Sequence, residues 1–165
     1  MIRLRVEKSD RKLISQKQVT RASRLAINDV TRKAHKELGG TVPKAHGTSI
    51  TGYRRVRSKK NLAKARKRRL RGIVWQGTKD IQATYAGKAR KVKGGVKAGR
   101  FFFPGAYIMR FKSGHVGIFK RVNGVVTEEM IELDRAKQMV NEVGRKALRD
   151  LPKAFRTQYK KLVKK

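Results

Sequence analysis

The chain has 165 residues, a length typical of one domain, and its 45 Lys and Arg against 11 Asp and Glu give a formal net charge of +34. The absence of cysteine excludes disulfides, zinc ribbons and thiol catalysis, and no apolar run reaches the roughly 18 residues of a membrane span. So strong a positive charge predicts a polyanionic partner, most commonly nucleic acid. An anionic membrane surface is the second choice, but no long amphipathic segment has the Lys-flanked apolar stripe that such binding needs, so we expect no membrane partner.

The N-terminal part of the chain predicts a short strand followed by a long helix. Apolar residues and arginines alternate over residues 2–6, which is the period of a strand. Apolar residues then recur every three or four positions, which is the spacing of one helix face: Val19, Ala22, Ala26, Val30, Ala34 and Leu38. We therefore expect a helix over residues 11–38 that ends at Gly39-Gly40.

The central part predicts two basic loops with short strands between them. Residues 39–66 are interrupted by glycines and a proline, and the basic run that follows has too few apolar residues to pack as more than a helical turn. The stretches 70–77 and 80–86 predict short strands. Residues 86–100 hold four glycines and six basic residues, so we expect a mobile basic loop without a packed element.

The most apolar stretch is FFFPGAYIMRFKSGHVGIF at residues 101–119, which holds five of the six phenylalanines. It predicts a strand, a turn at residues 112–115 and a return strand, and Asn123-Gly124 is a strong hairpin signal that adds a third strand. Pro104-Gly105 predicts an edge or a bulge. The side chains expected to pack against the helices are Phe101, Phe103, Tyr107, Phe111 and Phe119.

The C-terminal residues 135–165 predict a helix with an apolar stripe, kinked or divided near Pro152. The predicted fold is therefore α+β in a single domain, 1–165. An antiparallel meander around residues 67–132 would be packed by the N-terminal helix and the C-terminal helix or helices, with basic loops at about 39–66 and 86–100.

The positive charge is concentrated in residues 38–127, which hold 23 basic residues and a single acid, Asp80. Such a distribution predicts contacts with phosphates that depend steeply on salt and tolerate any base sequence. No helix-turn-helix, zinc-finger or RRM signature predicts base readout. The predicted phosphate contacts are Arg54, Arg55, Arg57, Lys59, Lys60, Lys64, Arg66, Lys67, Arg68, Arg69, Arg71, Lys88, Arg90, Lys91, Lys93 and Lys97.

Neither the histidines nor the acids form a pattern typical of catalysis. No histidine has a second ligand at metal spacing, and Ser113 and His115 lie only two residues apart in a predicted turn. We therefore expect no enzyme, metal or cofactor. The acids of EEMIELD predict a surface on which the basic face of a second copy docks, formed by Glu128, Glu129, Glu132 and Asp134.

Four segments resemble the minor tail protein Z family of tailed bacteriophages, also called tail completion proteins. They are LAINDVTRKAHKEL at 25–38, KRRLRGIVWQGTKDI at 67–81, GGVKAGRFFFPGAYIMRFKSGHVGIFKR at 94–121 and VTEEMIEL at 126–133. The third segment is the most specific. Val126-Thr127 stands where the family usually has Pro-Ile, and Tyr107 where Phe is common.

The resemblance implies a structural virion protein at the head-proximal end of the tail, made in the host cytoplasm and active in head–tail joining. It implies a homo-oligomeric ring, with a hexamer expected, that meets the tail tube or terminator and the neck proteins. Residues 54–71 and 86–100 would then contact duplex DNA in the lumen. Two alternatives are a monomeric nucleic-acid-binding protein of ribosomal or nucleoid type, and a nuclease, for which the basic centre has too few acids.

Overall fold

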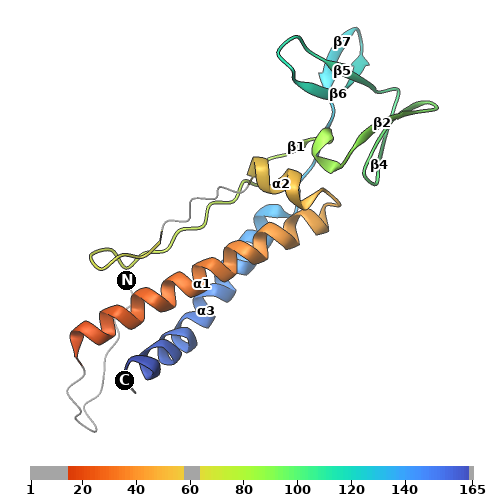
Figure 1. Ribbon diagram of the computed structural model, residues 1–165. Helices are drawn as coiled ribbons and strands as arrows, with labels where there is room; N and C mark the ends of the chain where they lie inside the picture. Colours follow the sequence, from red (N-terminus) through yellow and green to blue (C-terminus); the bar gives the residue numbers. More distant parts are fainter. Residues whose placement is uncertain (1–14, 58–63, 164–165) are drawn as a thin grey trace.

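The computed structural model describes residues 15–57 and 64–163, and its fold is α+β, as predicted. The long helices α1 (Gln16–Ala45) and α3 (Ala136–Val163) pack antiparallel as an elongated helix pair, and the strands are gathered at one end of this pair (Figure 1). The other elements are α2 (Ile50–Arg57), β1 (Ile81–Gln82), a 3-10 helix (Ala83–Ala86), β2 (Ala89–Val92), β3 (Gly95–Ala98), β4 (Phe101–Pro104), β5 (Tyr107–Arg110), β6 (Val116–Val122), β7 (Val125–Glu128) and β8 (Met130–Ile131).

Helix α1 buries the predicted stripe but does not end where the glycines predicted. It continues through Gly39-Gly40 and Pro43 as far as Ala45. Beyond Ala45 the chain turns away at Gly47, whose φ of 63° is left-handed, with Gly47 N donating to the Lys44 carbonyl and Thr48 N to the Pro43 carbonyl. This pair of bonds is a Schellman termination, which needs a left-handed residue at that position.

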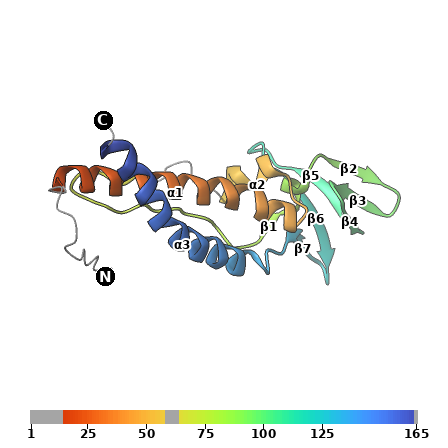
Figure 2. The same cartoon turned by 90° about the horizontal axis from the view of Figure 1, so that it is seen from below.

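Helix α3 is a single helix across Pro152, so of the two expected outcomes, a kink or a division into two helices, the division is wrong. Its predicted stripe faces α1, with Ala136 and Val143 buried. Figure 2 shows the last part of α3 turning away from the direction of its first part and crossing α1 near the C-terminus. The ring of Pro152 removes one helical hydrogen bond, which makes a change of direction inside the helix inexpensive.

The strands form three small antiparallel sheets where one sheet was predicted. Their orders are β1-β8, β2-β3-β4 and β5-β6-β7. The last of these is the predicted meander, and its second turn has left-handed φ values of 49° at Asn123 and 82° at Gly124, as the hairpin signal requires. Gly105, with φ of 69°, separates β4 from β5 and so divides the phenylalanine-rich stretch between two sheets.

Most of each predicted basic loop, where the structure describes it, forms helix or strand instead. Residues 39–45 belong to α1 and residues 50–57 to α2, while residues 86–100 contain the β2–β3 hairpin. Val96 and Ala98 of that hairpin are fully buried, because alternate residues of β3 face the core. Gly95 permits the pairing, since a Cβ there would overlap the Phe103 carbonyl oxygen.

The core lies where the end of the α1–α3 helix pair meets the sheets. It joins Leu38 and Val42 of α1 to Tyr53 of α2 and to Ile81 and Ile118 of the strands. Among the predicted core phenylalanines, Phe103 and Phe119 are buried and Phe101 packs against the core. Tyr107 is half-buried, whereas Phe111 is 41% exposed and packs on His115 and Phe119 at the sheet surface.

Residues 64–79, which we call the strap, run beside the helices without forming the strand predicted at 70–77 (Figure 1). Gly72 lies so close to α1 that a Cβ would overlap Thr31 Oγ1. Further along, the Tyr53 hydroxyl donates to the Gly77 carbonyl at 3.3 Å and accepts from Gln76 Nε2 at 2.7 Å. The strap is therefore held along the helices by contacts with α1 and α2, and it forms none of the strands of the three sheets.

Candidate nucleic-acid interface

The first group of predicted phosphate contacts lies on a tight turn at the start of the strap. Arg66 and Arg69 exchange backbone hydrogen bonds of 2.9 and 3.0 Å, so that Lys67 and Arg68 occupy the corners of the turn. The members of this group that the structure places on exposed positions are Lys64, Arg66, Lys67, Arg68, Arg69 and Arg71. We call residues 64–71 the basic turn.

An asparagine on α1 anchors the basic turn. The Oδ1 of Asn28 accepts from Ala65 N at 2.7 Å, and its Nδ2 donates to the Ala65 carbonyl at 3.3 Å. Ala65 is buried against the helix, with 4% exposure. This pair of bonds imitates a strand pairing, so the cations that follow are displayed from a fixed backbone and not from a free loop.

The second predicted group lies on the β2–β3 hairpin. Register pairs Arg90 with Lys97 and Lys97 with Phe102, so these three side chains form a row on the solvent face of the sheet. Phe102 is 51% exposed, and the whole group is exposed: Lys88, Arg90, Lys91, Lys93 and Lys97. Like charges directly opposite each other on adjacent strands destabilise a sheet, so this row favours an anionic partner.

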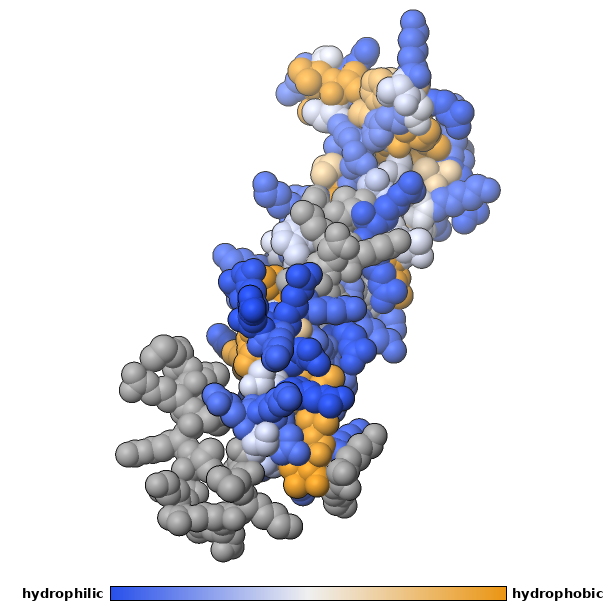
Figure 3. Space-filling view, turned by 60° about the vertical axis from the view of Figure 1, so that its left-hand side comes forward, coloured by the Kyte–Doolittle hydropathy of each residue, from blue (hydrophilic) through white to orange (hydrophobic). Residues whose placement is uncertain are grey.

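The two groups lie near opposite ends of the molecule. The basic turn is bonded to Asn28, whereas the strand end at Arg100 lies against Gly47 just beyond α1. Nineteen positions separate Asn28 from Gly47, which at 1.5 Å per residue is about 28 Å along the helix. A single duplex that touched both groups would have to run along the length of the molecule, and Figure 3 shows hydrophilic residues along one side over that length.

The remaining predicted contacts, on and beyond α2, do not all face solvent freely. Arg55 is exposed, but the Nε of Arg54 donates to the Gly39 carbonyl at 3.0 Å. Arg54 therefore has a structural bond that the sequence did not reveal. Arg57 lies in α2, while Lys59 and Lys60 lie outside the described residues, as does the strand predicted at 2–6.

Sequence reasoning missed three cations on the first half of α1. Lys17, Arg21 and Arg24 line a groove of about 610 Å³ together with Lys67 of the basic turn and Leu162 of α3. Their i, i+4, i+7 spacing places them on one helix face and was readable in the sequence. Their meeting with Lys67 was not readable, because it depends on how the strap returns along α1.

The acids predicted to dock a second copy are used unequally within the chain. Glu128 is half-buried and accepts from Gln82 Nε2 at 3.1 Å, with His115 Nε2 3.2 Å away. Asp134 lies 3.2 Å from His46 Nε2 and accepts from Arg135 N, yet its side chain is 70% exposed. Glu129 is half-buried and Glu132 is exposed. Of the four, Glu132 and Asp134 are therefore the ones presented to a partner.

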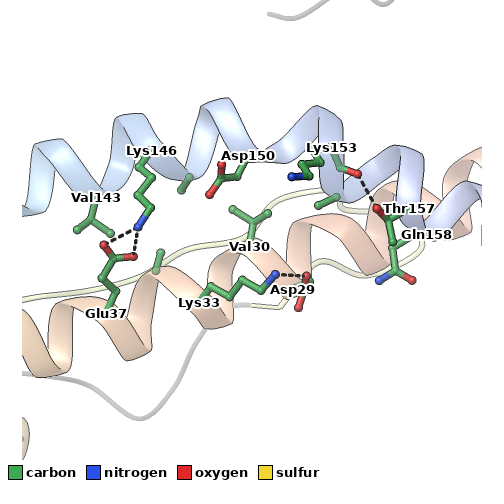
Figure 4. Close-up of a pocket in the computed structure, with 13 residues that line it drawn as sticks. Asp29, Val30, Lys33, Glu37, Val143, Lys146, Asp150, Lys153, Thr157 and Gln158 are labelled. Atoms are coloured by element: carbon green, nitrogen blue, oxygen red, sulfur yellow. Dashed lines mark hydrogen bonds and ion pairs between the residues drawn. The ribbon is translucent and has the colours of Figure 1, made fainter.

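Three other acids, Asp29, Glu37 and Asp150, lie along the seam between α1 and α3 (Figure 4). Lys146 donates to both carboxylate oxygens of Glu37 at 3.0 and 3.1 Å, and Lys33 lies 3.0 Å from Asp29. Val30 lies between the two helices beneath these pairs. The seam has both signs of charge, so it joins the helices and is not a surface for a polyanion.

Within residues 15–57 and 64–163, no three His, Asp or Glu side chains gather as metal ligands would. No helix in the same residues is long and apolar enough to cross a membrane. Comparisons with protein-family models, with curated proteins and with solved structures found no match.

Proposed function

We propose that the protein is a structural phage virion protein that binds duplex DNA without base specificity at the head-proximal end of the tail. The observation that carries the DNA contact is the arrangement of exposed Lys and Arg on ordered backbone, at the basic turn and on the β2–β3 hairpin. The assignment to the tail rests on the resemblance of four segments to tail completion proteins.

The chemistry of these groups favours backbone contacts over base readout. Lysine and arginine neutralise phosphates and release counterions, which yields affinity that falls steeply with salt. The cations project from a two-residue turn and a short hairpin, and neither is a helix that enters the major groove. Binding without base specificity suits a protein along which DNA must slide.

The ring is the second part of the proposal, with a hexamer as the expected form. Copies that each carry a net charge of +34 repel one another, so a ring needs either DNA in its lumen or complementary contacts between neighbours. The exposed carboxylates of Glu132 and Asp134 supply such contacts to a basic surface of the next copy. The tail tube or terminator and the neck proteins are the partners above and below.

The alternative is a monomeric nucleic-acid-binding protein of ribosomal or nucleoid type, which the charge alone would also favour. Light scattering after nuclease treatment in high salt, alone and with added tail tubes, separates the two. A ring-sized mass supports the proposal, and a chain that stays monomeric in both conditions contradicts it. Electron microscopy of assembled particles then tests the position: density for this chain anywhere but the head-proximal tail would overturn the assignment to the tail.

A further inference from the structure

A groove lies at the end of the α1–α3 helix pair that is far from the sheets, and three segments distant in the sequence line it. Nine of the described residues line it, and they come from the N-cap and start of α1, from Lys67 of the basic turn and from Leu162 near the end of α3. Four of them are cations, namely Lys17, Arg21, Arg24 and Lys67, and four others carry hydroxyl or amide groups. Among the described residues, no carboxylate lines the groove.

The four cations are not neutralised by any described residue. The nearest acid along α1 is Asp29, and its carboxylate is 3.0 Å from Lys33 on the seam with α3. Lys17, Arg21 and Lys67 are exposed, and Arg24 is half-buried. Like charges four residues apart on a helix destabilise it, so this cluster costs folding energy that a bound anion would offset.

We propose that this groove holds the sugar–phosphate backbone of duplex DNA. Lys17 and Arg24 are seven residues apart, which is about 10.5 Å along α1. Phosphates of one DNA strand follow one another about every 3.4 Å along the duplex axis, so the stripe spans about three of them. Lys67 faces the same strand from the other wall, and the hydroxyl and amide groups can donate further hydrogen bonds to phosphate oxygens.

An anionic membrane surface is the competing polyanion, and the lining of the groove argues against it. Membrane binding of this kind requires an apolar stripe that enters the lipid beside the cations. Among the described residues that line the groove, Leu162 is the only large apolar one. The inference rests on the proposed function only in taking DNA as the anion.

The test is a salt titration of the full chain with a labelled 20-base-pair duplex, followed by fluorescence anisotropy. The variant is K17Q/R21Q/R24Q, because glutamine keeps helix propensity while removing charge. The matched control is K137Q/R145Q/R149Q, which removes the same charge from exposed positions of α3. These lie at least 13 residues, or about 20 Å, from Leu162, which is well beyond a Debye length of about 10 Å at 0.1 M salt. Circular dichroism of both variants checks that they fold.

We expect the slope of log K against log salt to become shallower by about 2 to 3 in the groove variant and to change little in the control. If the two variants have equal slopes while the unaltered protein binds DNA with a steep salt dependence, the groove is not a DNA contact, and the proposed function still stands. A protein that shows no salt-dependent DNA binding at all would overturn the proposed DNA contact itself. Loss of binding to vesicles with 30% anionic lipid, without loss of DNA binding, would reassign the groove to membranes.

Discussion

The Nε of Arg54 donates to the carbonyl oxygen of Gly39, which is the oxygen that Pro43 leaves without its helical donor. In a regular helix the N–H of residue 43 would bond the carbonyl of residue 39, and proline has no N–H. Gly39 also gives the guanidinium room, since a Cβ there would lie 2.9 Å from Arg54 Nε. This relationship explains how α1 continues past Pro43, and why Arg54, one of the cations predicted to contact phosphates, has a structural role.

Arg54→Ala should destabilise the fold by about 1–3 kcal/mol, because it leaves the Gly39 carbonyl without a donor. The same change in a Pro43→Ala background should cost clearly less, because an alanine at that position restores the helical N–H. Urea unfolding of the four proteins measures the coupling between the two sites. Additive effects would show that the Arg54 bond does not replace the missing one.

Gly72→Ala should weaken the attachment of the strap to α1. The added Cβ would overlap Thr31 Oγ1, and we expect a cost of about 1–3 kcal/mol in urea unfolding. Gly144→Ala is the matched control, since nothing lies within 4 Å of its Cβ and glycine inside a helix is unfavourable by about 0.5–1 kcal/mol. Gly144→Ala should therefore stabilise the protein. A Gly72 variant as stable as the unaltered chain would contradict the close approach.

Asn28→Ala should release the basic turn while leaving α1 intact, because it removes both bonds to the Ala65 backbone. Trypsin under native conditions, with the products identified by mass spectrometry, should then cleave within residues 64–71 several times faster. Asn141→Ala, at an exposed position of α3, serves as the control. An unchanged cleavage rate after Asn28→Ala would mean that the asparagine does not hold the turn.

Lys97→Glu should stabilise the protein and weaken DNA binding at the same time. The introduced carboxylate would stand directly opposite Arg90 and replace a repulsive cross-strand pair with an attractive one, worth about 0.2–1 kcal/mol in unfolding. Lys97→Gln should lie between the two in both measurements. If DNA affinity at fixed salt stays the same across this series while stability rises, the solvent face of the β2–β3 hairpin is not a DNA contact.

Features that are encoded by residues close together in the sequence were predictable. The stripes of α1 and α3 and the turn at Asn123-Gly124 are each encoded by residues within a few positions of one another. The concentration of charge in residues 38–127 was likewise visible without a structure. Local composition also misled: Gly39-Gly40 predicted the end of α1, which continues to Ala45. Four glycines and six basic residues at 86–100 indicated a loop, although Val96 and Ala98 are the buried face of a strand.

The sequence alone thus determined that this is an α+β protein with two long amphipathic helices, a hairpin meander and a dominant positive charge, because periodicity and composition act over neighbouring residues. Only the tertiary structure decided where α1 ends, how the phenylalanine-rich stretch is shared between sheets, and which cations stand together. Lys67 lies in the same groove as Lys17, Arg21 and Arg24, although some 50 positions separate it from Lys17. Arg54 donates a hydrogen bond to the Gly39 carbonyl, 15 residues away in the sequence. Such meetings depend on the return path of the strap and on how α2 packs beside α1, neither of which a local pattern encodes.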